Sequence, residues 1–563
     1  LRLAMAQINT CVGDLDGNTQ KIISYIDQAL ARDCDIVTFP ELAVCGYPPE
    51  DLLFRRSFVK KNLQCLAQIR EHAGQILAVV GFVDYGNGRL FNSAAILANR
   101  KIVDIYHKRR LPNYGVFDEK RYFVEGADFK LYEVYGCRFG VNICEDIWAG
   151  NGVIGEQVKS GAGLVLTINA SPYHVGKIFL RQRLIEQQAK KNNVFISYTN
   201  LVGGQDELVF DGRSMSVSAK GRIISCAYAF KEDLSIVDIN LAQLAKKRKI
   251  KGIKVISIDL GKGSDPVALR PVRSSGLPQA EEIFEALKLG TRDYVAKNGF
   301  QKAALGLSGG IDSSLVAAVA VEAIGKENVS GVIMPSRFNS QDSYDDALAL
   351  ARNLGIDCKV IPIQDTFEHY LRILEPQFLG RQWGVAEENL QARIRGNILM
   401  ALSNKFGWLV LTTGNKSEMG VGYATLYGDM AGGFAVLKDV PKTVVYKLAE
   451  FFNIKAGRDV IPKRVFDKAP TAELKENQKD SDALPEYGVL DPIIKYYVED
   501  DSPVCDIIKK GFSEDVVLKV AAMVDKSEYK RRQSPPGIKI TPRAFGRDRR
   551  MPITNKFREA NDA

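Results

Sequence analysis

Three polar side chains in the first half of the chain each follow an apolar run typical of a buried strand. Glu41 follows such a run, Lys108 ends a second one, and Cys144 follows the apolar residues Phe139–Ile143. Because the ends of strands in one sheet lie close together, we expect the three side chains to meet. A carboxylate can take the proton of a thiol, and an ammonium group can stabilise the oxyanion of a tetrahedral intermediate. The trio therefore predicts attack on an amide, although a single cysteine at a strand end is more often a small core residue.

A glycine- and serine-rich turn dominates the second half. The run LGLSGGIDSS, residues 305–314, lies between an apolar strand, Ala303–Gly306, and an apolar helix, Leu315–Ile324. Gly309 and Gly310 allow positive φ and a close approach of the backbone to a ligand. The amides of the turn and of the helix N-terminus then form an anion site. Glycine and serine also suit an ordinary tight turn, and no lysine follows the glycines as it does in a P-loop.

Further polar residues of the second half fall on elements that could complete a nucleotide site. Asn389 and Arg393 are four residues apart on a predicted helix, so both project from one face. Thr413 and Glu418 follow a predicted strand, Trp408–Thr412, and ligands of open α/β sheets bind beyond the carboxyl ends of strands. Thr413 can donate a hydrogen bond to a nucleotide. Glu418 can hold Mg²⁺ or a ligand hydroxyl.

Short apolar runs alternate with helical patterns along the whole chain, which predicts an α/β protein with mainly buried strands. Helices are expected at Asn18–Arg32 and Ile178–Asn192, among others. Strands are expected at Leu3–Ile8, Ile36–Phe39, Ile76–Phe82, Ser93–Ala98, Phe139–Ile143, Leu164–Asn169, Val194–Thr199, Met215–Val217, Ala303–Gly306, Val329–Met334, Asp357–Ile361 and Trp408–Thr412.

Two different domains are predicted, joined by a connecting segment. The first α/β pattern covers residues 1–240 and the second covers residues 279–550. Residues 241–278, with a basic run and several glycines and prolines, connect them, and residues 551–563 form a tail. The polar stretch 463–487 is expected to be a mobile loop.

Composition excludes several classes of protein. The chain has 563 residues, of which 46% are hydrophobic and 25% charged, as in ordinary globular proteins. No apolar run approaches the roughly 18 residues that span a bilayer, so no membrane partner is expected. Nine scattered cysteines, with no Cys-x-x-Cys pair, favour a reducing, cytoplasmic location. With only four histidines, a histidine-rich metal site is not expected.

The net charge of +9 is concentrated in two segments. The segments are Lys246–Lys254 and Lys526–Arg550, and the remainder of the chain is slightly acidic. A basic patch can bind nucleic acid, an anionic membrane or a phosphorylated small molecule. A nucleic-acid interface would interleave aromatic residues with the basic ones, whereas only Tyr529 lies beside the run Lys530–Arg532. No nucleic-acid partner is therefore expected. For the second segment, the family resemblance of the run around Lys530, given below, implies a dinucleotide's phosphates as the partner.

The first half resembles the nitrilase superfamily. The resemblance lies in FPELAVCGYPPEDL, HKRRLPNYGVFDE and GVNICEDIW and covers about residues 1–240. It implies an αββα sandwich with Cys144 as nucleophile, Glu41 as general base, Lys108 as oxyanion stabiliser and Glu119 as a supporting second acid. The glutaminase branch of that superfamily takes glutamine as its ammonia donor. By the same resemblance the glutamine contacts are Tyr114, Ser171 and Lys177.

The second half resembles the N-type ATP pyrophosphatases, and among them the NAD⁺ synthetases. The resemblance lies in SGGIDSS, ENLQARIRGN, TTGNKSE, YGDMAGGFAVLKDVPKT and SEYKRRQSPPGIK. It implies a Rossmann-like parallel sheet of the adenine nucleotide alpha hydrolase type. Asn389, Glu418 and Lys530 would contact deamido-NAD, while Asp312 and Glu418 are candidate Mg²⁺ ligands. The implied ATP contacts are Gly306, Leu307, Ser308, Gly309, Gly310, Ile311, Asp312, Ser313 and Thr413.

Together the two resemblances imply a glutamine-dependent NAD⁺ synthetase. Glutamine would release ammonia in the first domain, and the ammonia would pass internally to an adenylated deamido-NAD in the second. ATP and Mg²⁺ are then required, no tightly bound organic cofactor is expected, and the chain is expected to form at least a homodimer. Two alternatives stay open: a synthetase acting on GMP or tRNA, which would need a different amidase half or an RNA-binding module, and a nucleic-acid-binding protein.

Overall fold

The computed structural model of the chain describes residues 1–148, 152–244, 253–261, 271–557 and 559. Its described residues divide into two compact units, Leu1–Gly276 and Leu277–Ala563. Most of the basic run Lys246–Lys254 lies outside the described residues. Among the described residues, no helix is long and apolar enough to cross a membrane.

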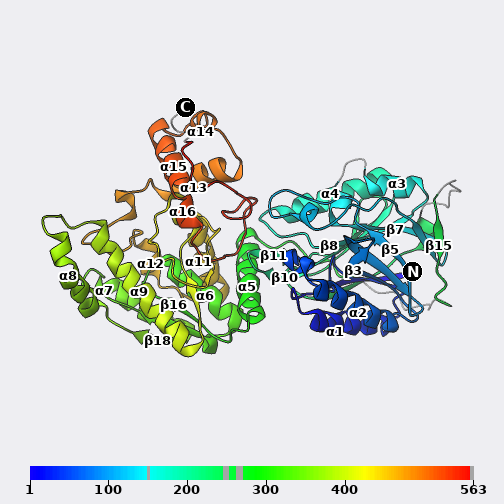
Figure 1. Ribbon diagram of the computed structural model, residues 1–563, viewed down its shortest axis with the longest axis horizontal. Helices are drawn as coiled ribbons and strands as arrows, with labels where there is room; N and C mark the ends of the chain where they lie inside the picture. The colour runs from blue at the N-terminus through cyan, green and yellow to red at the C-terminus, as the bar shows by residue number, and fades with distance from the viewer. Residues whose placement is uncertain (149–151, 245–252, 262–270, 558, 560–563) are drawn as a thin grey trace. The chain divides into compact units, whose positions relative to one another are not determined.

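The first unit is built on two sheets (Figure 1). The first has the order β14-β1-β2-β3-β4-β5 and the second the order β13-β12-β9-β8-β7-β6-β15. A separate hairpin joins β10 and β11. The strands are β1 (Arg2–Gln7), β2 (Ile36–Thr38), β3 (Leu77–Gly86), β4 (Arg89–Ala98), β5 (Lys101–His107), β6 (Leu131–Val134), β7 (Cys137–Ile143), β8 (Leu164–Asn169), β9 (Phe195–Asn200), β10 (Val202–Gln205), β11 (Leu208–Asp211), β12 (Met215–Val217), β13 (Ile223–Cys226), β14 (Asp233–Asp238) and β15 (Val255–Ser257).

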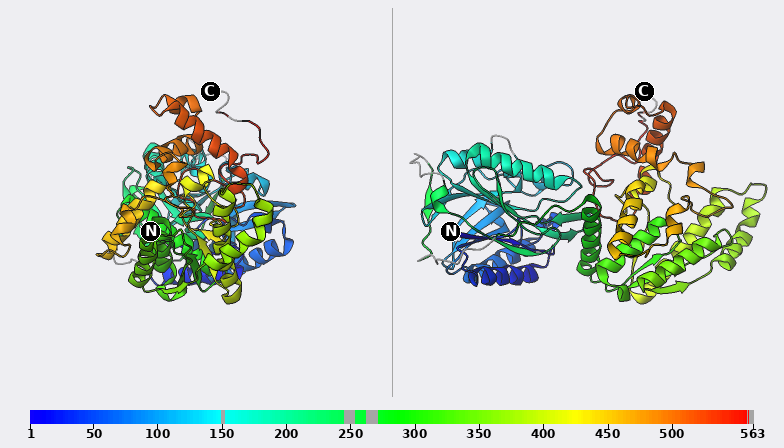
Figure 2. Two further views of the ribbon diagram at one scale, coloured as in Figure 1. Left: turned by 90° about the vertical axis from the view of Figure 1, so that its left-hand side faces the viewer. Right: turned by 180° about the vertical axis from the view of Figure 1, so that it is seen from behind.

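Helices cover the outer faces of both sheets, so the unit is an αββα sandwich, as predicted. Helices α1 (Leu15–Leu30) and α2 (Arg56–His72) pack on the first sheet, and α3 (Val153–Lys159) and α4 (Lys177–Asn192) on the second. Alternate residues of the strands point inward, and their side chains form an apolar core between the sheets. The rear view in Figure 2 shows the same layers, with the cyan α4 on one side and the blue α1 and α2 on the other.

The list of predicted strands lacks seven strands of the first unit: β5, β6, β10, β11, β13, β14 and β15. Strand β5 is the run that was expected to end at Lys108; its side chains are mostly half-buried or exposed, and it pairs with β4 along an antiparallel ladder. Strand β15 lies in the segment expected only to connect the domains, and it pairs with β6 in parallel. Both are edge strands. Each pairs with one neighbouring strand only, and its side chains need not be apolar on both faces.

The second unit contains a five-stranded parallel sheet of order β18-β17-β16-β19-β20. The strands are β16 (Ala303–Gly306), β17 (Val329–Ile333), β18 (Asp357–Val360), β19 (Leu409–Thr412) and β20 (Phe434–Ala435). From β16 the chain builds outward to β18 and then returns to add β19 on the other side. The strand order thus reverses between β16 and β19, where an open α/β sheet forms its ligand crevice. The predicted Rossmann-like sheet is confirmed.

Helices surround this sheet. Helices α5, α6 and α11 pack together, and α9 packs on β16 and β19 with α8 beside it. Near the C-terminus α13, α14 and α15 enclose a small core of their own. The helices are α5 (Gln279–Lys297), α6 (Ile311–Ile324), α7 (Gln341–Leu354), α8 (Gln364–Phe378), α9 (Val385–Phe406), α10 (Lys416–Val421), α11 (Lys442–Ala456), α12 (Lys463–Asp467), α13 (Tyr487–Ile494), α14 (Val504–Ile508), α15 (Glu514–Lys526) and α16 (Glu528–Arg531).

The polar stretch 463–487, expected to be a loop, contains helix α12 and a short 3-10 helix, Asp480–Asp482. Side-chain bonds fix it to α7. Arg464 pairs with Asp346, and Glu473 accepts hydrogen bonds from Ser340 and Ser343. These contacts add to the few buried apolar side chains of the stretch, Val465 and Leu484, and together they explain how a polar sequence holds a defined path.

Candidate functional site

Cys144 begins a short 3-10 helix, Cys144–Ile147, directly after β7. Its backbone has φ of +43°, in the left-handed region that a side chain disfavours, and its exposed fraction is 5%. Such strained residues persist only where the surroundings fix them, and they gather at active sites. The turn therefore holds the thiol at a defined point at the edge of the buried core between the two sheets.

Lys108 lies between two carboxylates. Its Nζ donates to Glu41 Oε1 at 2.6 Å and to both carboxylate oxygens of Glu119 at 2.8 Å. The side chains of Lys108 and Glu41 are fully buried, and that of Glu119 is 6% exposed. The structure thus brings together the residues that the nitrilase resemblance singles out, although their catalytic roles stay predictions.

The trio was expected at the ends of strands in one sheet, and that expectation is wrong in its geometry. Glu41 follows β2 and Lys108 follows β5, both in the first sheet, whereas Cys144 follows β7 in the second. The residues meet because the two sheets pack face to face over a shared apolar core. The close approach of the Glu41 loop needs Gly81, since a Cβ there would lie 2.2 Å from the carbonyl oxygen of Pro40.

Neighbouring donors hold the two carboxylates in place. Asn92 Nδ2 donates to Glu41 at 2.7 Å and to Glu119 at 3.3 Å. The backbone amide of Ala170 donates to the second oxygen of Glu41 at 3.0 Å, and the Tyr47 hydroxyl donates to Glu119 at 3.0 Å. The sequence analysis missed both side chains: Asn92 stands in no pattern that distinguishes it from a residue of the core, and Tyr47 was not singled out although it stands in the quoted motif FPELAVCGYPPEDL.

Burial and charge determine the protonation of this group. Burial raises the pKa of the Cys144 thiol well above its ordinary value; the charge of Glu41 adds to this rise and that of Lys108 opposes it. Burial lowers the pKa of Lys108, but Glu119 and Glu41 outweigh it and raise the pKa well above its usual range. Burial also raises the pKa of Glu119 to about 7, against the effect of Lys108. The thiol is therefore protonated at rest and needs a base to react, while Lys108 stays charged.

Two of the predicted glutamine contacts, Tyr114 and Lys177, lie near Cys144, together with a carboxylate that the sequence analysis missed. Tyr114 is exposed and donates from its hydroxyl to Glu145 Oε2 at 2.9 Å. Lys177 Nζ lies 4.4 Å from the centre of the Trp148 ring. Burial, and next the charge of Arg181, lowers the pKa of Lys177, while Cys144 and Glu145 oppose this change. Ser171 is buried. Glu145 directly follows Cys144 in the sequence, and that adjacency was the available signal.

A cavity of about 520 Å³ lies in the second unit, at the carboxyl ends of β16 and β19. It is lined by every predicted ATP and deamido-NAD contact except Gly309. Gly309 has φ of +76°, and a Cβ there would lie 2.1 Å from the carbonyl oxygen of Ser343. Gly309 thus shapes the turn against α7, while its neighbours face the cavity. The binding roles themselves stay predictions.

Asp312 and Glu418 share a cation within the cavity. Lys442 Nζ lies 2.5 Å from Asp312 Oδ2 and 3.3 Å from Glu418 Oε1, and Asn415 Nδ2 donates to Asp312 Oδ1 at 2.9 Å. Burial, and next to it the charge of Asp312, raises the pKa of Glu418 against the effect of Lys442. Lys442 is a functional candidate that the sequence analysis missed, although it stands in a quoted motif.

This pair of carboxylates fits Mg²⁺. Magnesium is commonly held by one or two carboxylates together with substrate phosphates, and residues of the turn predicted to bind phosphate line the same cavity as Asp312. In the parts of the chain that the structure describes, no cluster of three or more His, Cys, Asp or Glu side chains could hold a metal ion. Such a site would therefore depend on the nucleotide to complete it.

One arginine of α9 was assigned to the wrong face. Arg393 was expected to face the ligand together with Asn389, but its Nε donates to the carbonyl of Leu426 and it stays exposed. Arg395 lines the cavity instead, donating to the carbonyl of Met334 at 3.0 Å and to Asn339 Oδ1 at 3.1 Å. Burial lowers the pKa of Arg395 to about 10.

The basic segment Lys526–Arg550 is largely neutralised within the fold. Lys530 reaches the cavity and donates to the carbonyls of Gly422 and Ala424. Other cations of the segment pair with carboxylates: Arg531 with Glu528, Lys539 with Asp548, Arg543 with Asp501 and Arg549 with Asp525. Of the cations named here, only Lys530 therefore stays a candidate for binding a dinucleotide's phosphates.

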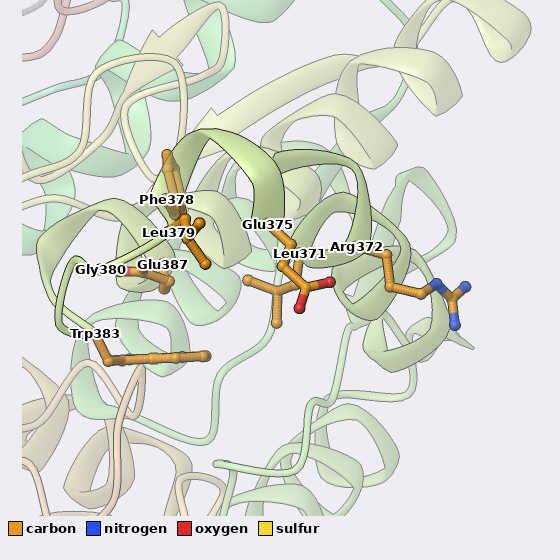
Figure 3. Close-up of a pocket in the computed structure, with 8 residues that line it drawn as sticks. All are labelled: Leu371, Arg372, Glu375, Phe378, Leu379, Gly380, Trp383 and Glu387. Carbon is orange, nitrogen blue, oxygen red and sulfur yellow. The ribbon is translucent and has the colours of Figure 1, made fainter.

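A second, shallower pocket lies between α8 and the turn into α9 (Figure 3). Apolar side chains form most of its wall, with Arg372 and Glu375 along α8. The predicted contacts to ATP and deamido-NAD line the larger cavity instead. We assign no reaction to this pocket.

Comparison with known proteins identifies relatives of both units. Residues 2–249 match the carbon-nitrogen hydrolase family and residues 283–534 match the NAD synthase family. The chain is 48% identical to the glutamine-dependent NAD(+) synthetase of Thermotoga maritima over 99% of both chains. It is also 48% identical to the enzyme of that name from Aquifex aeolicus, over 99% of this chain and 100% of the other.

Solved structures of two synthetases are also similar to this chain. The glutamine-dependent NAD+ synthetase of Acinetobacter baumannii, solved in complex with ADP, is 44% identical, covers 98% of each chain and has a TM-score of 0.76. A synthetase from Cytophaga hutchinsonii shares the fold at 21% identity, with a TM-score of 0.83.

Proposed function

Because the chain belongs to the glutamine-dependent NAD(+) synthetase family, we propose that its first unit releases ammonia from glutamine at Cys144 and its second unit amidates deamido-NAD. The enzyme is a glutamine-hydrolysing ligase, and ATP is one of its substrates. The observation that carries the proposal is the buried Lys108 between Glu41 and Glu119, whose charges act on the Cys144 thiol.

Glutamine hydrolysis then proceeds in two steps. Glu41 takes the proton of Cys144 as the sulfur attacks the amide carbon, and the Lys108 ammonium stabilises the oxyanion. Glu41 returns the proton to the leaving nitrogen, so ammonia departs and a γ-glutamyl thioester remains. Water, activated by the same carboxylate, hydrolyses the thioester to glutamate. Glu119 holds Lys108 in place through two hydrogen bonds.

The free end of glutamine is a zwitterion, and the groups near Cys144 complement it. Glu145 offers a carboxylate to the α-ammonium group, with Tyr114 fixing its position at 2.9 Å. Lys177 offers a cation to the α-carboxylate, and burial lowers its pKa before any substrate charge is present. Ser171, the third predicted contact, is buried. The opposite charges therefore orient the side-chain amide toward the thiol.

In the second unit, the turn 306–313 and Thr413 bind ATP, while Asn389, Glu418 and Lys530 bind deamido-NAD. Asp312 and Glu418 would hold Mg²⁺, which neutralises phosphate charge when bound. The nicotinate carboxylate attacks the α-phosphorus and pyrophosphate leaves. Ammonia then attacks the acyl carbon and AMP leaves, giving NAD⁺. Arg395 adds a buried cation to the same cavity. The ADP in the A. baumannii structure supports an adenine nucleotide as ligand.

We further propose that ammonia passes internally from the first unit to the second. Free ammonia in neutral solution is mostly ammonium, which is not a nucleophile, so internal transfer preserves the reactive form. The test supplies unlabelled glutamine together with ¹⁵N-ammonium at equal concentration. Less than about one tenth of the NAD⁺ amide nitrogen should carry ¹⁵N, and equal labelling would show that ammonia equilibrates with the solvent.

The two-site proposal is tested with Cys144→Ala. Glutamine-dependent NAD⁺ formation should fall at least about 1,000-fold, whereas formation from added ammonia should stay within about 2-fold. Cys137→Ala is the matched control, because Cys137 is a buried cysteine on the same strand, β7, and should keep both activities. Loss of both activities in a folded Cys144→Ala enzyme, or loss of neither, would contradict the proposal.

A further inference from the structure

The carboxylate of Asp146 accepts four hydrogen bonds close to the proposed glutaminase site. Its Oδ2 accepts from the backbone amide of Ile143 at 3.0 Å and from the hydroxyl of Tyr106 at 2.8 Å. Its Oδ1 accepts from the backbone amides of Arg109 at 3.1 Å and Arg110 at 2.9 Å. The residue is 1% exposed. Both oxygens are thus saturated by donors whose positions are set by backbone and core.

These four donors flank the two residues that meet at the site. Ile143 immediately precedes Cys144, and Asp146 itself lies two residues after it in the same 3-10 turn. Tyr106 lies two residues before Lys108 on β5, and Arg109 directly follows it. Since β5 and β7 belong to different sheets, one side chain ties together the ends of two strands that share no ladder.

The Cys144 turn needs such a restraint. Its φ of +43° is disfavoured for a residue with a side chain, so the surroundings must hold it there. Lys108 likewise stands at the point where β5 ends, and its amide donates to the carbonyl of Asn92 at 2.8 Å. Burial raises the pKa of Asp146 to about 6, with its hydrogen bonds and Lys108 opposing the rise. The group is therefore mainly ionised at neutral pH and accepts all four bonds.

We propose that Asp146 is a positioning residue that holds Lys108 and Cys144 in register for amide cleavage. The inference rests on the proposed role of Cys144 as nucleophile. Asp146 touches neither substrate nor reacting atoms, so it acts through the geometry of the other two. An error of about 1 Å in such geometry can cost about 100-fold in rate.

The test is Asp146→Asn. Asparagine has the same shape, but its amide nitrogen would face two donors whichever way the group turns, so two of the four bonds are lost. We expect kcat for glutamine hydrolysis to fall about 10- to 100-fold, while KM for glutamine changes less than about 3-fold. Ammonia-dependent NAD⁺ formation should stay within about 2-fold, which also reports that the chain is folded.

A second readout separates positioning from mere support of the fold. Cys144 is alkylated with iodoacetamide across a pH series, and the modified peptide is quantified by mass spectrometry. Because burial, and next the charges of Glu41 and Lys108, determine the pKa of the thiol, a change in the relative positions of these groups should shift the midpoint of this profile by about half a pH unit or more. In Asp146→Glu, kcat and the alkylation profile should return only partly to the wild-type values, because glutamate keeps the charge but has a side chain that is one methylene longer.

Asp104→Asn is the matched control. Asp104 also lies on β5 and accepts from a tyrosine hydroxyl, that of Tyr132, at 2.7 Å, but it touches neither strand end at the site. It should keep kcat within about 2-fold and leave the alkylation profile unchanged. A folded Asp146→Asn enzyme with unchanged kcat and profile, or with only a raised KM, would overturn the proposal.

Tyr106→Phe decides the question if Asp146→Asn does not fold. It removes one of the four donors and should lower kcat about 3- to 10-fold with a shifted alkylation profile; no change in either would overturn the proposal.

The variant Cys144→Ala distinguishes a failure of the proposed function from a failure of the positioning role. If that variant keeps glutamine-dependent activity, the nucleophile is wrong. If it loses the activity while Asp146→Asn keeps its kcat, only the positioning role fails.

Discussion

Lys108→Met removes the buried ammonium group and leaves a side chain of similar length. Glu41 and Glu119 then face each other without a cation, in a site where the three side chains are between 0% and 6% exposed. Breaking a buried ion pair in this way costs about 3–5 kcal/mol of unfolding free energy. In a unit of this size, about 3 kcal/mol corresponds to a fall of roughly 6–12 °C in the midpoint of thermal unfolding. Glutamine hydrolysis should fall about 100- to 1,000-fold, because the oxyanion loses its cation.

The loss of stability should depend on pH, and its sign follows from Glu119. Burial already raises the pKa of Glu119 to about 7 while Lys108 lowers it, so removing Lys108 raises it further. A carboxyl whose folded pKa is raised binds more protons in the folded state, and stability falls as pH rises through that pKa. The deficit of the variant relative to the wild type should therefore be small near pH 5 and largest near pH 8.5.

Differential scanning calorimetry at pH 5.5 and 8.5, combined with an assay of glutamate release, measures both effects. The double variant Lys108→Met with Glu119→Gln removes one carboxylate together with the cation. It should recover at least half of the lost stability at pH 8.5, yet stay inactive as a glutaminase. An equal deficit at both pH values, or a double variant no more stable than the single one, would refute the buried-charge reasoning.

Three further predictions concern the two sites. Glu145→Gln should raise KM for glutamine about 10-fold or more while ammonia-dependent NAD⁺ formation is unchanged, because the α-ammonium loses its counter-charge; an unchanged KM in steady-state kinetics would exclude that contact. Asp312→Asn should lower both glutamine- and ammonia-dependent NAD⁺ formation at least about 100-fold, and loss of only one would contradict its place in the synthetase site. Gly309→Ala should weaken ATP binding in calorimetry, because the added Cβ meets the Ser343 carbonyl at 2.1 Å; wild-type affinity would show that the turn adapts.

Much of the fold was predictable because its signals are local. Buried strands such as β8 and β16 are short apolar runs with exact bounds in the sequence, and both were predicted residue for residue. The bounds of β5 were not predicted, although Lys108 was expected at the end of its apolar run, and β15 was assigned to the connecting segment because it is short and largely exposed. Helix boundaries moved by a few residues, since capping rather than the apolar pattern sets where a helix begins.

The sequence by itself determined which residue types stand at the ends of strands, and that was enough to predict a thiol, a carboxylate and an ammonium group in one half and a phosphate-binding turn in the other. Only the tertiary structure decided that Cys144 comes from a different sheet than Glu41 and Lys108, that Asp146 links the two strand ends, and that Arg395 faces the cavity. The physical reason is that period and spacing report one element at a time. Packing between residues far apart in the chain decides which faces of two elements meet. The sequence pattern of one element does not identify the element that packs against it.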